Sequence, residues 1–556
     1  MHLLVCVLAV AVVAMCWPSS GMCWAARLGA MLDALAARRA ACVLGIAILS
    51  LLYSFGSNLV LKTPAPRCAD EFGYLLEADT FAHGRLMTAT HPLWRYFETF
   101  HEIFQPSHTA KFPPAQGAAI AFGQLLHKPI LGVWLTTAFA CAAVLWMLFA
   151  WLPPRWTLAV SLLVVFNPQI AMWNWTYWGG SIALGAGALL LGGYRRIADP
   201  ASDACPIGTG VMMGIGMGIL AVSRPYEGFV LSAVVMVVLL FDLASAHRLS
   251  VLLKAAPPII VIVAAAGAFI LHYNKVITGN PLLMPYVLYE RTYDAAPLFL
   301  WQKLPAIPDY RHAAMRDFYL GAREYAAYQQ TLSGFIRSAI GKLEDFGLFF
   351  WSAIPLIFFL AVPGALREDR WLRRALIIAL ASAAAISMSN YVFNHYEAPV
   401  LPLLFVFIGA CMQRVWRWRL RNRPTGATLV AGLAILMLLY SFGFFFIRQL
   451  KNQRGANWGF WRDRLAASLS ADGHKNLVLV RYSRDHDLNQ EWVYNAADLD
   501  SAPVLWARDM RDTSPDANRE LLDAFKDRTI WVFNPDTDAK PQPYGSAAAV
   551  AKPGSI

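Results

Sequence analysis

Apolar segments of helical length recur along the chain from the N-terminus to about residue 448, separated by polar connections. A helix that crosses a bilayer needs about 20 mainly apolar residues. Nine stretches approach or exceed this length: Cys42–Leu61, Leu131–Leu152, Cys205–Val222, Gly228–Phe241, Ala255–Leu271, Phe346–Leu366, Ala375–Phe393, Ala398–Gln413 and Thr425–Ile447. The uncharged segment Trp156–Tyr194 is long enough for two more, broken near Asn167-Pro168 and Trp173–Trp175. The pattern therefore predicts about eleven to twelve spanning helices, with Leu3–Trp17 as the twelfth candidate.

Lysine and arginine concentrate in alternate connections between these stretches, and basic connections normally face the cytoplasm. If each stretch crosses once, one side of the membrane receives Arg38-Arg39, Arg155, Arg195-Arg196, Arg248 with Lys254, the Arg367–Arg374 cluster and the five arginines of Arg414–Arg423. The outer side then holds two long loops, at about residues 62–130 and 273–345, and the whole tail after Arg448. This alternation predicts a multi-pass inner-membrane protein.

The two ends of the chain differ from this pattern. Leu3–Trp17 is either a span or a signal-like segment, although only Met-His precedes it and no small-x-small cleavage site follows. The tail is densely charged, and Asn476–Tyr482, Val504–Ala507 and Thr529–Phe533 have the composition of strands. We therefore expect an N-terminal segment 1–41, a membrane domain 42–448 and an outer α/β domain 449–556.

Composition agrees with a membrane protein, since 57% of residues are hydrophobic and 15% charged, against about 25% charged in soluble domains. Mean hydropathy is +0.44. The net charge of +11 does not indicate nucleic-acid binding, because the basic residues are spread over short connections instead of gathering on one soluble face. We expect the protein to contact membrane lipids and not nucleic acid. Eight cysteines without a CxxC pair argue against a disulfide framework or a cysteine metal site.

Two groups of residues in the first outer loop are candidates for chemistry. Asp70 and Glu71 come directly after a span. Two adjacent carboxylates at a membrane surface lose hydration and repel each other, so their presence there suggests a functional role. In a helix, Asp70, Tyr74 and Glu77 share one stripe. A solvated helix start is the alternative, because acids are favoured near that end of the helix dipole.

Lys111 precedes Pro113-Pro114, which favour the start of a helix. A helix N-terminus beside a lysine is a natural phosphate site. The alternative is a lysine whose apolar stem lies in the membrane interface.

The order of these motifs resembles the GT-C membrane glycosyltransferases, in particular the protein O-mannosyltransferase and lipid A aminoarabinose transferase group. The matching features are a span followed by Asp70-Glu71 with Tyr74, then Gly84-Arg85, then Lys111 with Pro113-Pro114, then Ser223-Arg224-Pro225, and last Asn394-His395-Tyr396-Glu397-Ala398-Pro399. Each motif is short, so the resemblance depends on their order and on their side of the membrane. It implies an all-α, GT-C-like membrane domain with a late soluble outer domain.

The resemblance also implies a reaction: inverting transfer of a sugar from a polyprenyl-phosphate donor to a lipid, glycan or protein acceptor. By position, Asp70 would be the base, Glu71 its support or an acceptor contact, and Lys111 a partner of the donor phosphate. Arg224 would be a weaker second candidate for the phosphate; the alternative is an interfacial arginine that anchors a helix end. Tyr74, Arg85, His395 and Tyr396 are the remaining substrate-binding candidates.

A divalent metal is a possible cofactor, but no residue is assigned as its ligand. The first outer loop contains Glu98, His101, Glu102 and His108, and imidazole and carboxylate groups suit such an ion. However, the sequence lacks an HExxH motif. Some relatives carry an acidic residue directly before the lysine of the K-P-P motif, and this chain has Ala110 there.

Two other functions remain open from the sequence. A transporter or flippase for a lipid-linked or anionic substrate would show broken helices with polar groups near the bilayer midplane, whereas the polar residues here lie in outer loops. A structural or assembly factor would leave Asp70 and Lys111 replaceable. The aromatic cluster Trp173–Trp178 is typical of a membrane-interface belt, or lies against a sugar or lipid.

Overall fold

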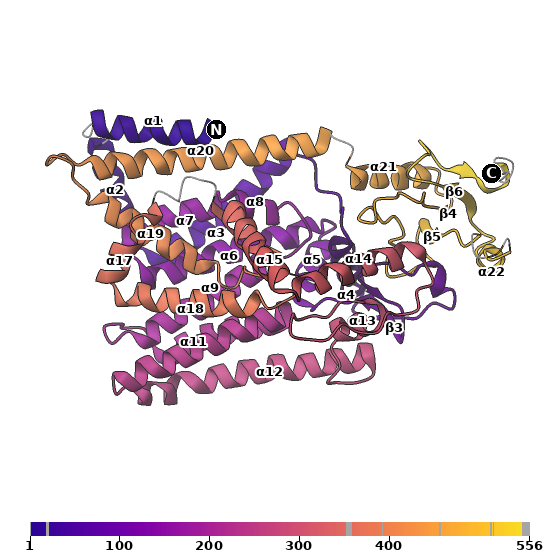
Figure 1. The fold of residues 1–556 in the computed structure, drawn as a ribbon, viewed down its shortest axis with the longest axis horizontal. Helices are drawn as coiled ribbons and strands as arrows, with labels where there is room; N and C mark the ends of the chain where they lie inside the picture. The colour runs from indigo at the N-terminus through magenta and orange to yellow at the C-terminus, as the bar shows by residue number, and fades with distance from the viewer. Residues whose placement is uncertain are drawn as a thin grey trace.

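The computed structural model describes residues 2–17, 22–351, 358–391, 393–454, 457–511, 514 and 516–547. Within these ranges, six helices are long and apolar enough to cross a membrane. They are α3 (Arg39–Val60), α6 (Ile130–Trp151), α10 (Pro206–Ser223), α11 (Pro225–Ser245), α12 (Leu252–Thr278) and α20 (Thr425–Arg454). Figure 1 shows α11, α12 and α20 running roughly parallel, with the small C-terminal sheet at the far end of the molecule. The prediction of a helical membrane protein with a small C-terminal α/β domain is confirmed.

Further helices complete the bundle. They are α1 (His2–Cys16), α2 (Met22–Ala36), α7 (Pro154–Val165), α8 (Pro168–Trp173), α9 (Ser181–Ala198), α15 (Leu332–Trp351), α17 (Val362–Glu368), α18 (Arg370–Ile386) and α19 (Pro402–Trp416). Several of them begin at a proline. Proline has no backbone N–H group, and in the first turn of a helix that group would have no partner within the helix in any case. Part of the predicted span Phe346–Leu366 lies outside the described ranges.

The break predicted inside the uncharged segment 156–194 lies between α7 and α8. There the Asn167 side chain accepts hydrogen bonds from the amides of Gln169 and Ile170, at 2.9 and 3.2 Å. It therefore caps α8. The chain then turns through residues 174–180 before α9 begins at Ser181.

The N-terminal helix α1 packs along α20 (Figure 1). A glycine allows this close approach, since a Cβ on Gly432 of α20 would lie 2.6 Å from a methyl carbon of Val10. Residues 2–16 thus form part of the helical bundle in this structure. Helix α2 follows and contacts α7, with Arg155 Nε 3.7 Å from a carboxylate oxygen of Asp33.

The first outer loop folds into a compact unit around helix α4 (Ala69–Ala82). A three-stranded antiparallel sheet follows, in the order β1-β3-β2, from β1 (Thr88–Ala89), β2 (Glu102–Ile103) and β3 (Ser107–Ala110). The register pairs Thr88 with His108 and Glu102 with Ala110. Lys111 and Phe112 come directly after β3, and helix α5 (Ala115–Leu125) begins after the predicted proline pair.

The second outer loop supplies helices α13 (Pro285–Tyr293) and α14 (Ala313–Gln329). Both lie near α4 and β3 in Figure 1. Contacts join the two loops: the amide of His101 donates to the Tyr289 hydroxyl at 2.7 Å, and Tyr293 donates to a Glu98 oxygen at 2.9 Å. The two long outer loops therefore form one structure over the helical bundle.

The C-terminal domain contains α21 (Trp458–Ser470) and a four-stranded sheet in the order β5-β4-β6-β7. The strands are β4 (Asn476–Val480), β5 (Val504–Arg508), β6 (Thr529–Phe533) and β7 (Gln542–Pro543), with α22 (Arg519–Ala524) between β5 and β6. β5 and β6 are both parallel to the central β4, and β7 is antiparallel to β6. The three predicted strands are confirmed.

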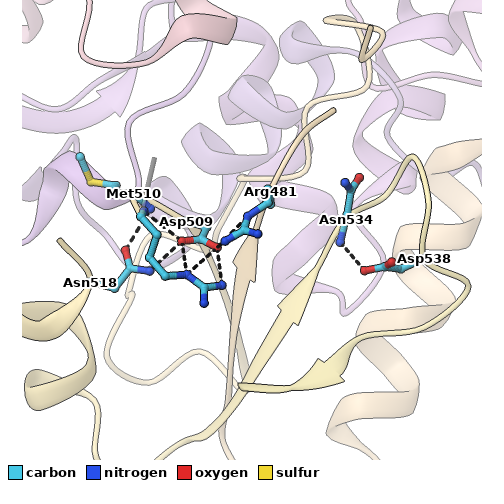
Figure 2. A network of polar contacts seen from close by, with 7 residues as sticks. Arg481, Asp509, Met510, Asn518, Asn534 and Asp538 are labelled. Carbon is cyan, nitrogen blue, oxygen red and sulfur yellow. Dashed lines mark hydrogen bonds and ion pairs between the residues drawn. The ribbon is translucent and has the colours of Figure 1, made fainter. Parts of the chain in front are cut away.

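Polar contacts tie together the chain segments that leave the parallel strands (Figure 2). Asp509, just after β5, is the centre of this network. One of its oxygens lies 2.8 Å from Arg481 Nη2, just after β4, and the other accepts from Asn518 Nδ2 at 2.8 Å. Asn518 in turn accepts from the Met510 amide at 2.9 Å. These bonds fix the loop ends that face the rest of the outer region.

Aromatic stacking attaches this domain to α4. The rings of Phe72 and Tyr494 stack at 4.1 Å between centroids, and the Arg462 guanidinium lies 4.9 Å from the Phe72 centroid. Two hydrogen bonds support the contact: Trp458 Nε1 donates to the Arg67 carbonyl at 3.1 Å, and the Ala497 amide donates to Asp79 at 2.8 Å. The C-terminal domain is therefore fixed at both ends of α4.

One close approach of backbones fixes the outer turn that precedes α19. A Cβ on Gly187 of α9 would lie 2.0 Å from the Pro399 carbonyl oxygen, so only glycine fits there without a shift. Overpacking of this kind costs about 1–3 kcal/mol. We expect Gly187→Ala to lower the midpoint of thermal unfolding in detergent by a few degrees.

Gly45→Ala provides the control for this prediction, because a Cβ there meets nothing within 4 Å. Alanine favours a helix over glycine by about 1 kcal/mol, so that variant should unfold at the wild-type temperature or slightly above. Equal midpoints for the two variants would contradict the packing at Pro399.

Candidate active site

A cavity of about 790 Å³ lies where the two outer loops, the ends of the bundle helices and the C-terminal domain meet. Six of the residues that the sequence singled out line it: Asp70, Tyr74, Lys111, Arg224, His395 and Tyr396. They come from positions up to 326 residues apart in the chain (396 − 70). The fold thus brings most of the predicted site residues to one place.

Asp70 lies in the first turn of α4, and its Oδ1 is 2.7 Å from His101 Nδ1. Burial alone would raise the pKa of Asp70, but the contact with His101 and the nearby Lys111 ammonium group outweigh it and lower the pKa to about 2. Asp70 is therefore ionised at neutral pH.

His101 has a left-handed backbone with φ of 63°, which a residue with a Cβ rarely adopts. The Lys111 amide donates to its carbonyl at 3.0 Å, and the hydroxyl of Tyr289 accepts from its amide. Burial and the nearby charge of Lys111 lower the pKa of His101, so the ring is neutral. This strained conformation holds the imidazole against Asp70, in the manner seen at functional sites.

Lys111 is buried, and its ammonium group lies between aromatic rings. Nζ is 4.8 Å from the ring centroid of Tyr286 and 4.5 Å from that of Tyr289. It is also 3.3 Å from Oε1 of Glu290, whose side chain is 9% exposed. The lysine that the motif predicted is therefore in the cavity, paired with an acid from the second outer loop.

Glu290 has a second carboxylate nearby, that of Asp294, one turn further along the chain. Burial raises the pKa of Glu290, the charge of Lys111 lowers it, and Asp294 raises it further. The net direction is upward. The carboxyl group of Glu290 is therefore harder to ionise in the cavity than it would be in water.

The opposite wall comes from the membrane helices and the turn after α18. The Arg224 guanidinium, between α10 and α11, lies 4.8 Å from the ring centroid of Tyr396. The His395 ring contacts Trp178, with centroids 4.6 Å apart. Burial and then the charge of Arg224 lower the pKa of His395, so this imidazole is also neutral.

Two predicted residues do not line the cavity. Glu71 is 1% exposed and faces backbone, accepting from the Arg67 amide at 2.8 Å and the Tyr177 amide at 3.1 Å. Arg85 is exposed, beyond the end of α4. In the stripe Asp70, Tyr74 and Glu77, the first two line the cavity and Glu77 is buried beside Gly117.

The candidate metal ligands pair with other groups. Glu102 lies 3.1 Å from His108 Nε2, and a Glu98 oxygen lies 3.4 Å from His312 Nε2. Among the residues that the structure describes, no three His, Cys, Asp or Glu side chains are arranged to hold a metal ion. The geometry assigns no ligand set.

Several cavity residues were not singled out from the sequence. Glu290 and Asp294 belong to the second outer loop, and Leu488, Asn489 and Glu491 come from the C-terminal domain. Glu290 lies within α13, and no motif in the sequence marks it. The C-terminal domain has no recognisable catalytic motif in its sequence. Residues 488–494 reach the cavity because the domain packs against the loops in the folded protein.

Comparison with known proteins shows no matching family model and no curated protein with significant sequence similarity. Solved structures do match. The crystal structure of ArnT from Cupriavidus metallidurans bound to undecaprenyl phosphate has a TM-score of 0.51, covers 92% of this chain and 94% of that chain, and is 14% identical. The structure of the same protein in the apo state has a TM-score of 0.49 over 93% and 96%, at 14% identity.

The chain has the GT-C fold. At 14% identity the likeness is one of fold, and it confirms the architecture that the order of the motifs implied. In this fold, the cavity with Asp70 and Lys111 lies where the two long loops, the ends of the bundle helices and the C-terminal domain meet.

Proposed function

We propose that this chain is an integral membrane glycosyltransferase that moves a sugar from a polyprenyl-phosphate donor to an acceptor. The observation that carries the proposal is the single cavity lined by an ionised Asp70 and a buried Lys111. The GT-C fold supports it, and so does the undecaprenyl phosphate bound to the ArnT structure of the same fold. The acceptor is a lipid, a glycan or a protein.

The proposed reaction needs a base and a stabiliser for the leaving group. Asp70, ionised and oriented by His101, takes the proton of the acceptor nucleophile as that atom bonds to the anomeric carbon. The bond between that carbon and the phosphate oxygen breaks, and the lipid phosphate leaves with the electron pair. Lys111, and Arg224 across the cavity, balance its charge. Attack from the face opposite the phosphate inverts the anomeric configuration.

The remaining predicted residues have supporting roles in this proposal. Tyr74, which stacks on Phe112 at 4.5 Å, and Tyr396, beneath Arg224, form apolar walls with polar tips suited to sugar hydroxyls. His395 is a neutral donor or acceptor beside Trp178. Glu71 fixes the start of α4 through its two backbone contacts, and so supports Asp70 without touching the substrate.

We further propose that the protein lies in the inner membrane, with its C-terminal domain and both long loops on the outer side. The alternation of basic connections supports this orientation. Residues 417–420 belong to the arginine-rich connection before α20, and α21 and the sheet follow that helix. The cavity would then open toward the outer face, where an envelope acceptor is available.

Replacement of the base is the first test. Asp70→Asn is nearly isosteric and should reduce sugar transfer at least about 100-fold, because general-base catalysis contributes about 10²–10⁴-fold. The measurement follows radiolabelled polyprenyl-phosphate sugars in membranes, with a crude envelope extract as acceptor. Asp309→Asn, at an exposed carboxylate of the second outer loop, is the control and should transfer normally. Equal transfer by wild type and Asp70→Asn would remove Asp70 from the chemistry, and no transfer from any donor would favour the transporter alternative.

Lys111 should act on the donor. We expect Lys111→Ala to raise the KM for the lipid-phosphate donor about 10- to 100-fold, since a charge-assisted contact contributes about 1.5–3 kcal/mol. The KM for the acceptor should change far less. Lys303→Ala, at an exposed lysine of the same outer loop system, should match wild type. A wild-type KM for the donor in Lys111→Ala would contradict the assigned role.

Orientation is tested with single cysteines and a membrane-impermeant maleimide. His474→Cys, exposed in the C-terminal domain, should be labelled in cells whose inner membrane is intact. Arg419→Cys, exposed in the basic connection before α20, should be labelled only after lysis. Labels are compared with the wild-type background, and the reverse pattern would overturn the topology.

A further inference from the structure

The phosphate partner Lys111 already has an anionic partner inside the cavity. Its ammonium group lies 3.3 Å from Glu290, and the two side chains are 7% and 9% exposed. Tyr286, Tyr289 and Phe112 surround the ammonium group at 4.8, 4.5 and 6.0 Å from their centroids. A phosphate group bound at Lys111 would therefore be within reach of the Glu290 carboxylate, with aromatic rings in place of screening water.

Negative charge accumulates on this side of the cavity. Asp294 and Asp70 line it together with Glu290. Lys111 is the cation in contact with Glu290, and Arg224 lies across the cavity against Tyr396. The raised pKa of Glu290 agrees with this crowding of acidic groups, because burial and the nearby Asp294 both disfavour a negative charge there.

The two lipid phosphates of the proposed reaction differ in charge. A sugar-linked donor is a phosphodiester and carries one negative charge at any pH above about 2. The lipid left after transfer is a phosphomonoester, whose second ionisation is near pH 6, so it carries almost two charges at neutral pH. Binding the product therefore brings one more negative charge beside Glu290 and Asp294 than binding the donor.

We propose that Glu290 makes the Lys111 site select a singly charged phosphodiester over a doubly charged phosphomonoester, so that the spent lipid leaves after transfer. The proposal rests on the proposed function, because it concerns the same lipid-phosphate site. Lys111 attracts either lipid, and Glu290 offsets enough of its charge that the second charge of the monoester meets net repulsion. Glu290 is thus a specificity-determining residue for the state of the lipid carrier.

The test compares two probes on the purified full chain in detergent at about pH 8, where a phosphomonoester is doubly ionised. One probe is undecaprenyl phosphate and the other its methyl ester, a phosphodiester with the same lipid. The measurement is the Kd of each. We expect wild type to bind the methyl ester at least about tenfold more tightly, a difference of about 1.4 kcal/mol. In Glu290→Gln, which keeps the shape and removes the charge, the preference should fall below about threefold through tighter binding of the monoester.

Two further variants test whether the preference for the methyl ester depends on the carboxylates beside Lys111. Asp487→Asn is the control, because Asp487 is exposed and its side chain contacts Asn489 and Gln490 and not Lys111. It should keep the wild-type preference. Asp294→Asn should reduce the preference for the methyl ester in part, because Asp294 adds to the negative charge beside Lys111. This variant serves as the test if Glu290→Gln does not fold. A wild-type preference in both Glu290→Gln and Asp294→Asn overturns the proposal.

Failure of this proposal is distinguishable from failure of the proposed function. Equal Kd values of the two lipids for wild type would overturn the charge selection while leaving a lipid-phosphate site in place. Binding of neither lipid by any variant would overturn the lipid-phosphate donor, and the charge selection with it.

Discussion

The outer region of this protein depends on burying charge without leaving it unpaired. Asp70, Lys111 and Glu290 lie at the edge of an apolar bundle, where an isolated charge would be costly. Each has a partner within 3.3 Å, His101 for Asp70 and the Lys111–Glu290 pair for the other two. Lys111 and Glu290 come from different loops, so the two loops must pack together before this pair can form. The chemistry of the cavity and the folding of the loops are therefore coupled.

The C-terminal domain completes this arrangement. Its Tyr494 stacks on Phe72, two residues after Asp70, and Arg508 donates from Nε to the Glu98 carbonyl at 2.7 Å while its Nη2 lies 2.7 Å from Glu491. The domain thus holds α4 and the first outer loop together and lines part of the cavity with Leu488, Asn489 and Glu491. Charge contacts are stronger in such buried surroundings than in water, which is why a domain without catalytic residues matters to the proposed reaction.

The charges of the cavity also give the proposed reaction a direction. An ionised Asp70 beside a neutral His101 accepts a proton from the acceptor, and Lys111 receives the leaving phosphate. The same Lys111 is offset by Glu290, so the site does not retain the more highly charged product. A single lysine can then serve both binding and release, because its acidic partner sets how much negative charge the site tolerates.

The sequence by itself determined the membrane class, the positions of most helices, the strands of the tail and six residues of the cavity. These follow from hydropathy, helix and strand periodicity and short motifs, which depend on neighbours close in the chain. The partners of those residues were decided only by the tertiary structure. His101 appeared as one of several metal candidates, Glu290 as one acid among many, and Asn489 as part of an outer domain. Nothing local in the sequence reports which side chains meet across loops more than 100 residues apart, because packing of the whole chain sets those contacts.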